Sequence, residues 1–72
     1  MRFPRVTAKE LLRTLQKHGF RATGQSGSHL HIDHPKTGCR STIPMHTGKI
    51  IGPGLLKAIC RQLGVDPRDL EW

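Results

Sequence analysis

Apolar residues recur at helical spacing in two parts of this chain. The first stripe is Ala8, Leu11, Leu12 and Leu15, and the second is Leu56, Ile59, Cys60 and Leu63. The first stripe begins within the capping box Thr7-Ala8-Lys9-Glu10 and precedes Gly19, a residue suited to a left-handed helix end. The pattern therefore predicts a helix over about residues 7–18.

The second stripe has equally clear ends. Gly52-Pro53 is typical of an N-cap followed by the first helical position, and Gly64 is typical of the end of a helix. These signals predict a second helix from Pro53 to the residue before Gly64. Asp66-Pro67-Arg68-Asp69 then predicts a short helical turn near the C-terminus.

Between the helices, apolar and polar residues alternate strictly from His29 to Asp33. Successive side chains of a strand point to opposite faces, so Leu30 and Ile32 are expected to face the core. His29, His31 and Asp33 then lie together on the opposite, wet face.

Two further strands complete the prediction. Residues 20–25 favour an extended chain, residues 24–28 a hairpin connection and residues 35–38 a turn. Residues 40–45 return as a third strand, which Pro44 ends because proline has no amide for the ladder. We predict one α+β domain over residues 1–72, ordered α-β-β-β-α, with both helices on one face of a three-stranded antiparallel sheet. This is the element order of double-stranded-RNA-binding domains.

Charge narrows the choice of partners. The chain has 72 residues and a net charge of +7. Residues 1–65 contain eleven lysines and arginines but only two acids, Glu10 and Asp33, a net charge of +9. Such a surface is suited to a phosphate backbone or an acidic protein, whereas solubility alone needs no such excess.

Location and redox state follow from what the sequence lacks. It has no run of about 18 apolar residues that could span a membrane, and its N-terminus does not resemble a signal peptide. We therefore expect a cytoplasmic protein without membrane association, with Cys39 and Cys60 as reduced thiols. Cys60 lies on the helical stripe and is expected to pack as a small hydrophobe.

Three motifs together resemble one protein family. They are Gly27-Ser28-His29, the segment Pro44-Met45-His46-Thr47-Gly48-Lys49, and Gly54-Leu55-Leu56-Lys57-Ala58-Ile59. This combination is similar to the HicA toxins, small mRNA interferases of type II toxin–antitoxin systems with a fold like that of double-stranded-RNA-binding domains. The resemblance covers nearly the whole chain. It implies an endoribonuclease acting on mRNA, with His29 as the catalytic residue and a HicB-like antitoxin as partner.

The chemistry of RNA cleavage agrees with that implication. RNA has its own nucleophile, the 2′-hydroxyl beside the scissile phosphate, so no metal or other cofactor is needed. A histidine at His29 could take that proton. Gly27 would let the backbone approach the phosphate, and the Ser28 hydroxyl could bind it.

Other candidate RNA contacts are the basic and polar residues Lys36, Arg40, His46, Lys49 and Lys57. His46 has two open roles beside a purely structural one. It could bind phosphate with Lys49, or it could protonate the leaving 5′-oxygen. Lys36 and Arg40 flank a turn and Lys57 lies on the second helix, regions where this fold contacts phosphates.

Three alternatives remain open. His29, His31, His34 and Cys39 could suggest zinc, but His34 is expected on the other face from His29 and no paired-cysteine motif accompanies them. The same fold could bind RNA without cutting it. The charge could instead serve only to bind an acidic protein partner.

Overall fold

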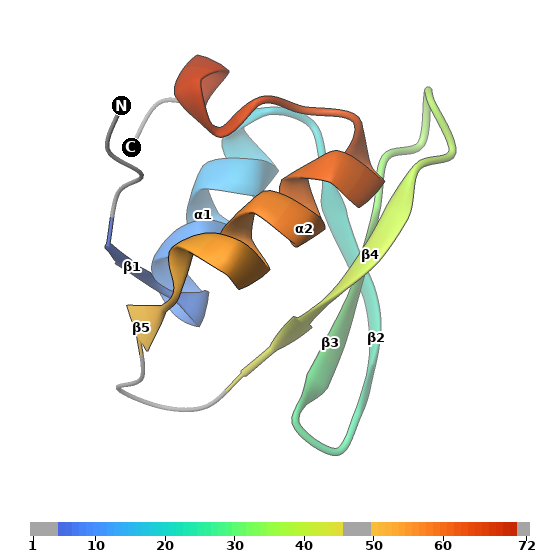
Figure 1. Ribbon diagram of the computed structural model, residues 1–72. Helices are drawn as coiled ribbons and strands as arrows, with labels where there is room; N and C mark the ends of the chain where they lie inside the picture. Colours follow the sequence, from blue (N-terminus) through green and yellow to red (C-terminus); the bar gives the residue numbers. More distant parts are fainter. Residues whose placement is uncertain (1–4, 46–49, 71–72) are drawn as a thin grey trace.

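The computed structural model of the chain describes residues 5–45 and 50–70 (Figure 1). In chain order the elements are β1 Val6–Thr7, α1 Ala8–Lys17, β2 Arg21–Ser26, β3 His29–Asp33, β4 Arg40–Pro44, β5 Ile50–Ile51, α2 Pro53–Leu63 and a 3₁₀ turn Pro67–Asp69. The predicted α+β fold, with its three-stranded antiparallel sheet and two helices, is confirmed. No helix among the described residues is long and apolar enough to cross a membrane.

Both helices have the ends that their sequences predict. At α1 the Thr7 hydroxyl accepts from the Glu10 amide at 3.2 Å, and the Glu10 carboxylate accepts from the Thr7 amide at 3.2 Å. Gly19 follows α1 with φ 91°, and Gly64 ends α2 with φ 72°. Positive φ favours glycine, which explains why both helices stop there.

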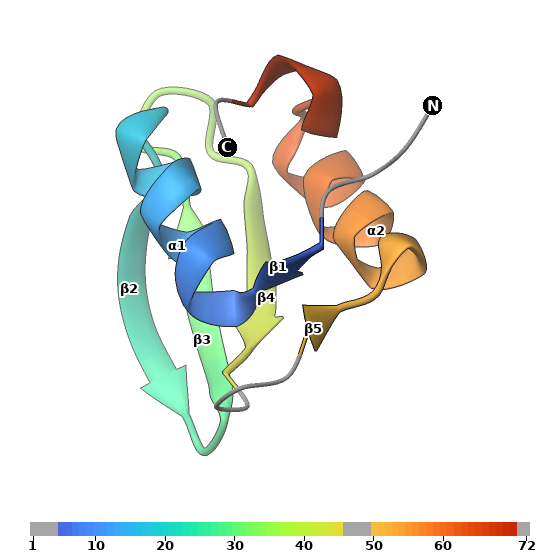
Figure 2. The same cartoon turned by 90° about the vertical axis from the view of Figure 1, so that its left-hand side faces the viewer.

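The sheet has the strand order β2-β3-β4, with antiparallel neighbours. Leu30 and Ile32 of β3 are buried, whereas His29 and His31 are exposed, as the alternating pattern predicts. On β4, Ser41 and Ile43 face the core in the same way. Both helices pack on this buried side, where Figure 2 shows them in front of the sheet, and the other face of the sheet is left open (Figure 1).

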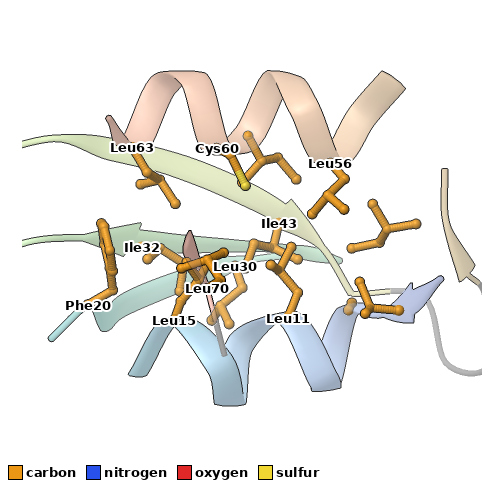
Figure 3. Packing of buried hydrophobic residues seen from close by; sticks show 14 residues of the cluster. Leu11, Leu15, Phe20, Leu30, Ile32, Ile43, Leu56, Cys60, Leu63 and Leu70 are labelled. Carbon is orange, nitrogen blue, oxygen red and sulfur yellow. The ribbon is translucent and has the colours of Figure 1, made fainter. Parts of the chain in front are cut away.

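The core lies between the helices and the inner face of the sheet (Figure 3). The helices contribute Leu11 and Leu56, and the sheet contributes Ile43; all three side chains are fully buried. Cys60 packs among them as predicted, and its burial raises the pKa of the thiol to about 11. This thiol is therefore an inert part of the core at neutral pH.

One element of the fold is absent from the sequence prediction. Residues Val6–Thr7 pair antiparallel with Ile50–Ile51, which forms a small ribbon, β1–β5, separate from the main sheet. A two-residue strand is too short to show a period-2 pattern, and its partner strand lies far away along the sequence. The ribbon joins the start of α1 to the segment that leads into α2.

Candidate functional site

The histidine of the Gly-Ser-His motif lies at the tip of a tight hairpin. Gly27 and Ser28 form the two-residue turn between β2 and β3, and Gly27 has φ 58° while Ser28 keeps a negative φ. This combination is typical of a type II′ turn, which has glycine at its first central position. His29 is therefore the first residue of β3, and its side chain is exposed on the open face.

The turn is tied to the end of β4. The Ser28 carbonyl accepts a hydrogen bond from the Met45 amide at 2.6 Å, beyond the last strand pair, His29 with Pro44. Met45 thus lies at the same end of the sheet as His29. The candidates His46 and Lys49, which follow in the sequence, lie outside the described residues.

Three rows of side chains cross the open face, since directly paired residues of neighbouring strands point to the same side. The rows are Ser26, His29 and Pro44; then Gly24, His31 and Thr42; then Arg21, Asp33 and Arg40. The first two rows contain no lysine, arginine, aspartate or glutamate. The fixed charges gather in the third row.

The third row is an ion-pair cluster. The Arg21 guanidinium donates to the Asp33 carboxylate at 2.7 Å, and this hydrogen bond lowers the pKa of Asp33 below its ordinary value. Arg40, which pairs with Asp33 on the other side, lowers the pKa further by its charge. Asp33 is therefore ionised at neutral pH, and two guanidiniums outweigh its negative charge.

His31 belongs to the second row, between the row of His29 and the charged third row. Its Nε2 atom is 3.4 Å from the Ser26 hydroxyl on β2. The residue of β2 that pairs with His31 is Gly24, where an added Cβ would meet no atom within 4 Å. A hollow in the surface beside the ring is lined by Thr23, His31, Asp33, Arg40 and Thr42, with Ile32, Ser41 and Gln62.

The structure brings only part of the predicted site together. Gly27, Ser28 and His29 are consecutive at the hairpin end. Lys36, in the turn after β3, and Arg40 lie at the opposite end of the sheet, roughly 13 Å away along the four residues from His29 to Asp33. They can contact only a phosphate other than the one beside His29.

Lys57 lies on another side of the molecule from His29. It is exposed on α2, on the helix side of the sheet, where it lines a groove with Arg61 and Arg68. In that groove Arg68 is held by the Asp66 carboxylate at 2.7 Å. An RNA strand on the open face would have to pass around the molecule to reach Lys57.

His34 has a structural role that separates it from the other histidines. Its ring packs edge-on against Phe20, with 4.8 Å between ring centroids, and its Nδ1 accepts from the Lys36 amide at 3.1 Å. The predicted separation of His34 from the face of His29 and His31 agrees with this contact to a buried ring. Within residues 5–45 and 50–70, no three potential ligands are grouped to hold a metal ion.

Sequence reasoning gave His31 and Ser26 no role in catalysis. The spacing of two between His29 and His31 already places both on one face. The position of Ser26 beside them depends on the two-residue turn Gly27–Ser28, which pairs Ser26 with His29. The sequence prediction assigned residues 24–28 to the connection and so left Ser26 outside the strand.

Comparison with known proteins identifies the family. The family described as "HicA toxin of bacterial toxin-antitoxin" matches the chain over residues 8–65, from the first residue of α1 to just beyond α2. Searches of curated proteins and of solved structures found no match. The matched range contains the hairpin, all three rows of the open face and both helices. The chain therefore belongs to the HicA toxin family of bacterial toxin–antitoxin systems.

Proposed function

We propose that this protein is a metal-independent endoribonuclease that cleaves mRNA, with His29 as its essential catalytic residue. The observation that supports this most is the position of His29. An exposed imidazole follows a glycine turn on an open polar face, in a chain that belongs to a toxin family. An imidazole so placed can reach a bound polyanion without any rearrangement of the core.

The proposed reaction uses the nucleophile that RNA provides. His29 accepts the proton of the 2′-hydroxyl, and the oxygen attacks the neighbouring phosphorus. The bond from phosphorus to the 5′-oxygen then breaks, which leaves a 2′,3′-cyclic phosphate and a 5′-hydroxyl. The leaving 5′-oxygen receives a proton from a second group, so that it departs as a hydroxyl. No metal-bound water is required, because water is not the attacking group.

The hairpin turn supplies the contacts closest to His29. Without a Cβ, Gly27 keeps a φ of 58° and leaves its surroundings open, with no atom within 4 Å of where a side chain would begin. A phosphate can therefore approach the backbone of the turn. The Ser28 hydroxyl can donate to it, although this residue is half-buried and its carbonyl is already engaged by Met45.

More distant cations would hold the rest of the strand. Lys36 and Arg40 are exposed at the far end of the open face. Their charges would attract neighbouring phosphates and orient the RNA along β3. Since such binding releases counterions, affinity is expected to fall steeply as salt is raised.

The family also implies an antitoxin partner. We propose a HicB-like protein with an acidic segment that covers the basic surface and prevents RNA from reaching His29. Complementary charge of this kind speeds association and selects the partner. Expression of this antitoxin would protect cells from the toxin.

The rival function is an RNA-binding module that does not cut. The test is the purified protein with a long RNA in EDTA, followed by analysis of the product ends. We expect cleavage to give 5′-hydroxyl ends, and we expect a single 2′-deoxy substitution at a mapped cleavage position to abolish cleavage there. A 5′-phosphate product, or cleavage beside the deoxyribose, would refute the mechanism. Salt-sensitive binding with no cleavage would establish the rival.

A further inference from the structure

His31 has the best position on the open face for a second part in the reaction. It lies two residues after His29 on the central strand, which places their Cα atoms roughly 7 Å apart. Both side chains are exposed and point to the same side. A single phosphate group on this face can therefore lie between the two imidazoles.

Ser26 links the two rings. It is paired directly with His29, which places their Cβ atoms about 5 Å apart. At the same time its hydroxyl is 3.4 Å from Nε2 of His31. The three side chains thus form one continuous patch, in which the contact with Ser26 limits how far the ring of His31 can turn.

The surroundings of His31 leave room for substrate. The position opposite it on β2 is Gly24, which has no side chain, and the space above that position is empty to 4 Å. On the other side lies Thr42, which is half-buried. A nucleoside leaving from the phosphate would find this opening directly beside the ring.

Other described groups are poorly placed to donate the proton that the leaving oxygen needs. Asp33 shares the face, but Arg21 holds it as a carboxylate at neutral pH. His34 packs against Phe20 and accepts from the Lys36 amide. Besides the two imidazoles, the polar side chains of the first two rows are the hydroxyls of Ser26 and Thr42, which are much weaker acids than an imidazolium.

We propose that His31 is a second catalytic residue, the general acid that protonates the 5′-oxygen as it leaves. This assignment rests on the proposed ribonuclease function. His29 gains the proton of the 2′-hydroxyl; the bond from the 2′-oxygen to phosphorus forms as the bond from phosphorus to the 5′-oxygen breaks. The 5′-oxygen takes its proton from the imidazolium of His31. One proton is gained and one is given, so the reaction needs no further co-reactant.

The sharpest test removes the need for an acid. In an RNA oligonucleotide with sulfur in place of the bridging 5′-oxygen at the cleavage position, the leaving group is a thiolate. Since a thiol ionises near pH 8.5, it leaves without a proton. We expect the change His31→Ala to slow cleavage of ordinary RNA by about 10²–10⁴-fold. The same variant should cut the sulfur substrate within several-fold of the wild-type rate, while His29→Ala is slow on both.

Three controls separate this role from simpler ones. His31→Lys retains a positive charge but is a far weaker acid, so it should not restore cleavage of ordinary RNA. Gln16→Ala, on the exposed side of α1, should behave like wild type. Urea unfolding of each variant shows that the rates come from folded protein.

Every outcome of these measurements either supports or overturns the assignment of His31 as the general acid. Equal slowing of His31→Ala on both substrates, or ordinary RNA cut at the wild-type rate, overturns the assignment while the ribonuclease function stands. Recovery in His31→Lys also overturns it, in favour of phosphate binding. If the wild type cuts neither substrate, the proposed function itself fails and this assignment fails with it.

Discussion

The packing of both helices on one strand makes a quantitative prediction about Ile43. This side chain, near the end of β4, is fully buried between Leu11 of α1 and Leu56 of α2 (Figure 3). The change Ile43→Ala removes three carbons. At about 0.8 kcal/mol for each, the lost transfer free energy is about 2.4 kcal/mol. A residual cavity on the order of 50 Å³ adds about 1.2 kcal/mol at 24 cal/mol per Å³.

The total, about 3.5 kcal/mol, is large for a protein of this size. At 0.05–0.15 kcal/mol per residue, a chain of 72 residues has a stability of roughly 4–11 kcal/mol. A loss of about 3.5 kcal/mol corresponds to a fall in Tm of about 14–28 °C at this length. The variant is therefore expected to retain a stability of only roughly 0.5–7 kcal/mol.

The chain offers a matched control for this measurement. Ile50 has the same side chain but is 54% exposed on β5, so Ile50→Ala is expected to cost about 1 kcal/mol. The assay is equilibrium unfolding in urea, followed by circular dichroism, with the free energy taken from midpoint and slope. Equal losses for the two variants would refute the inference that both helices close over β4.

Three further predictions follow from the turns and charges. Gly27→Ala should lower the free energy of unfolding by about 1 kcal/mol because of its left-handed φ, whereas Gly24→Ala, also in open space but without positive φ, should cost clearly less; equal costs would contradict this. The Arg68 guanidinium lowers the pKa of Asp66 from 3.8 to about 2, so its contribution to stability is present above about pH 4 and is lost as the pH falls towards 2. Acid titration of unfolding should therefore show a smaller loss for Asp66→Asn than for wild type, and identical curves would exclude a role for the pair. Finally, in the double variant Lys36→Gln/Arg40→Gln, the negative slope of log affinity for single-stranded RNA against log salt should become shallower by about 1.4, and an unchanged slope would remove both residues from the interface.

Much of the fold follows from local signals in the sequence. The capping box at Thr7 and Glu10 and the glycines after each helix fix the helix ends within a residue or two. The alternation around Leu30 and Ile32 fixes which face of β3 is buried. These signals work because each acts within a few residues along the chain.

What the sequence could not supply depends on contacts between distant segments. The pairing of Val6 with Ile51 leaves no periodic pattern, because each strand has only two residues. The contact between Arg21 and Asp33 depends on the bulge in β2, which shifts the strand pairing between Ala22 and Gly24. The separation of Lys36 from His29 by the length of β3 likewise needed the structure, since charge alone does not say which cations share a surface.

The central claim is that His29 cuts RNA and is not needed to bind it or to fold. The most direct measurement is the single-turnover cleavage rate of wild type and His29→Ala on one RNA in EDTA, at protein concentrations that bind all the RNA. We predict a rate about 10²–10⁴-fold lower in the variant, with unchanged affinity and with unfolding free energies that agree within about 0.5 kcal/mol. Cleavage by His29→Ala at the wild-type rate would contradict the account.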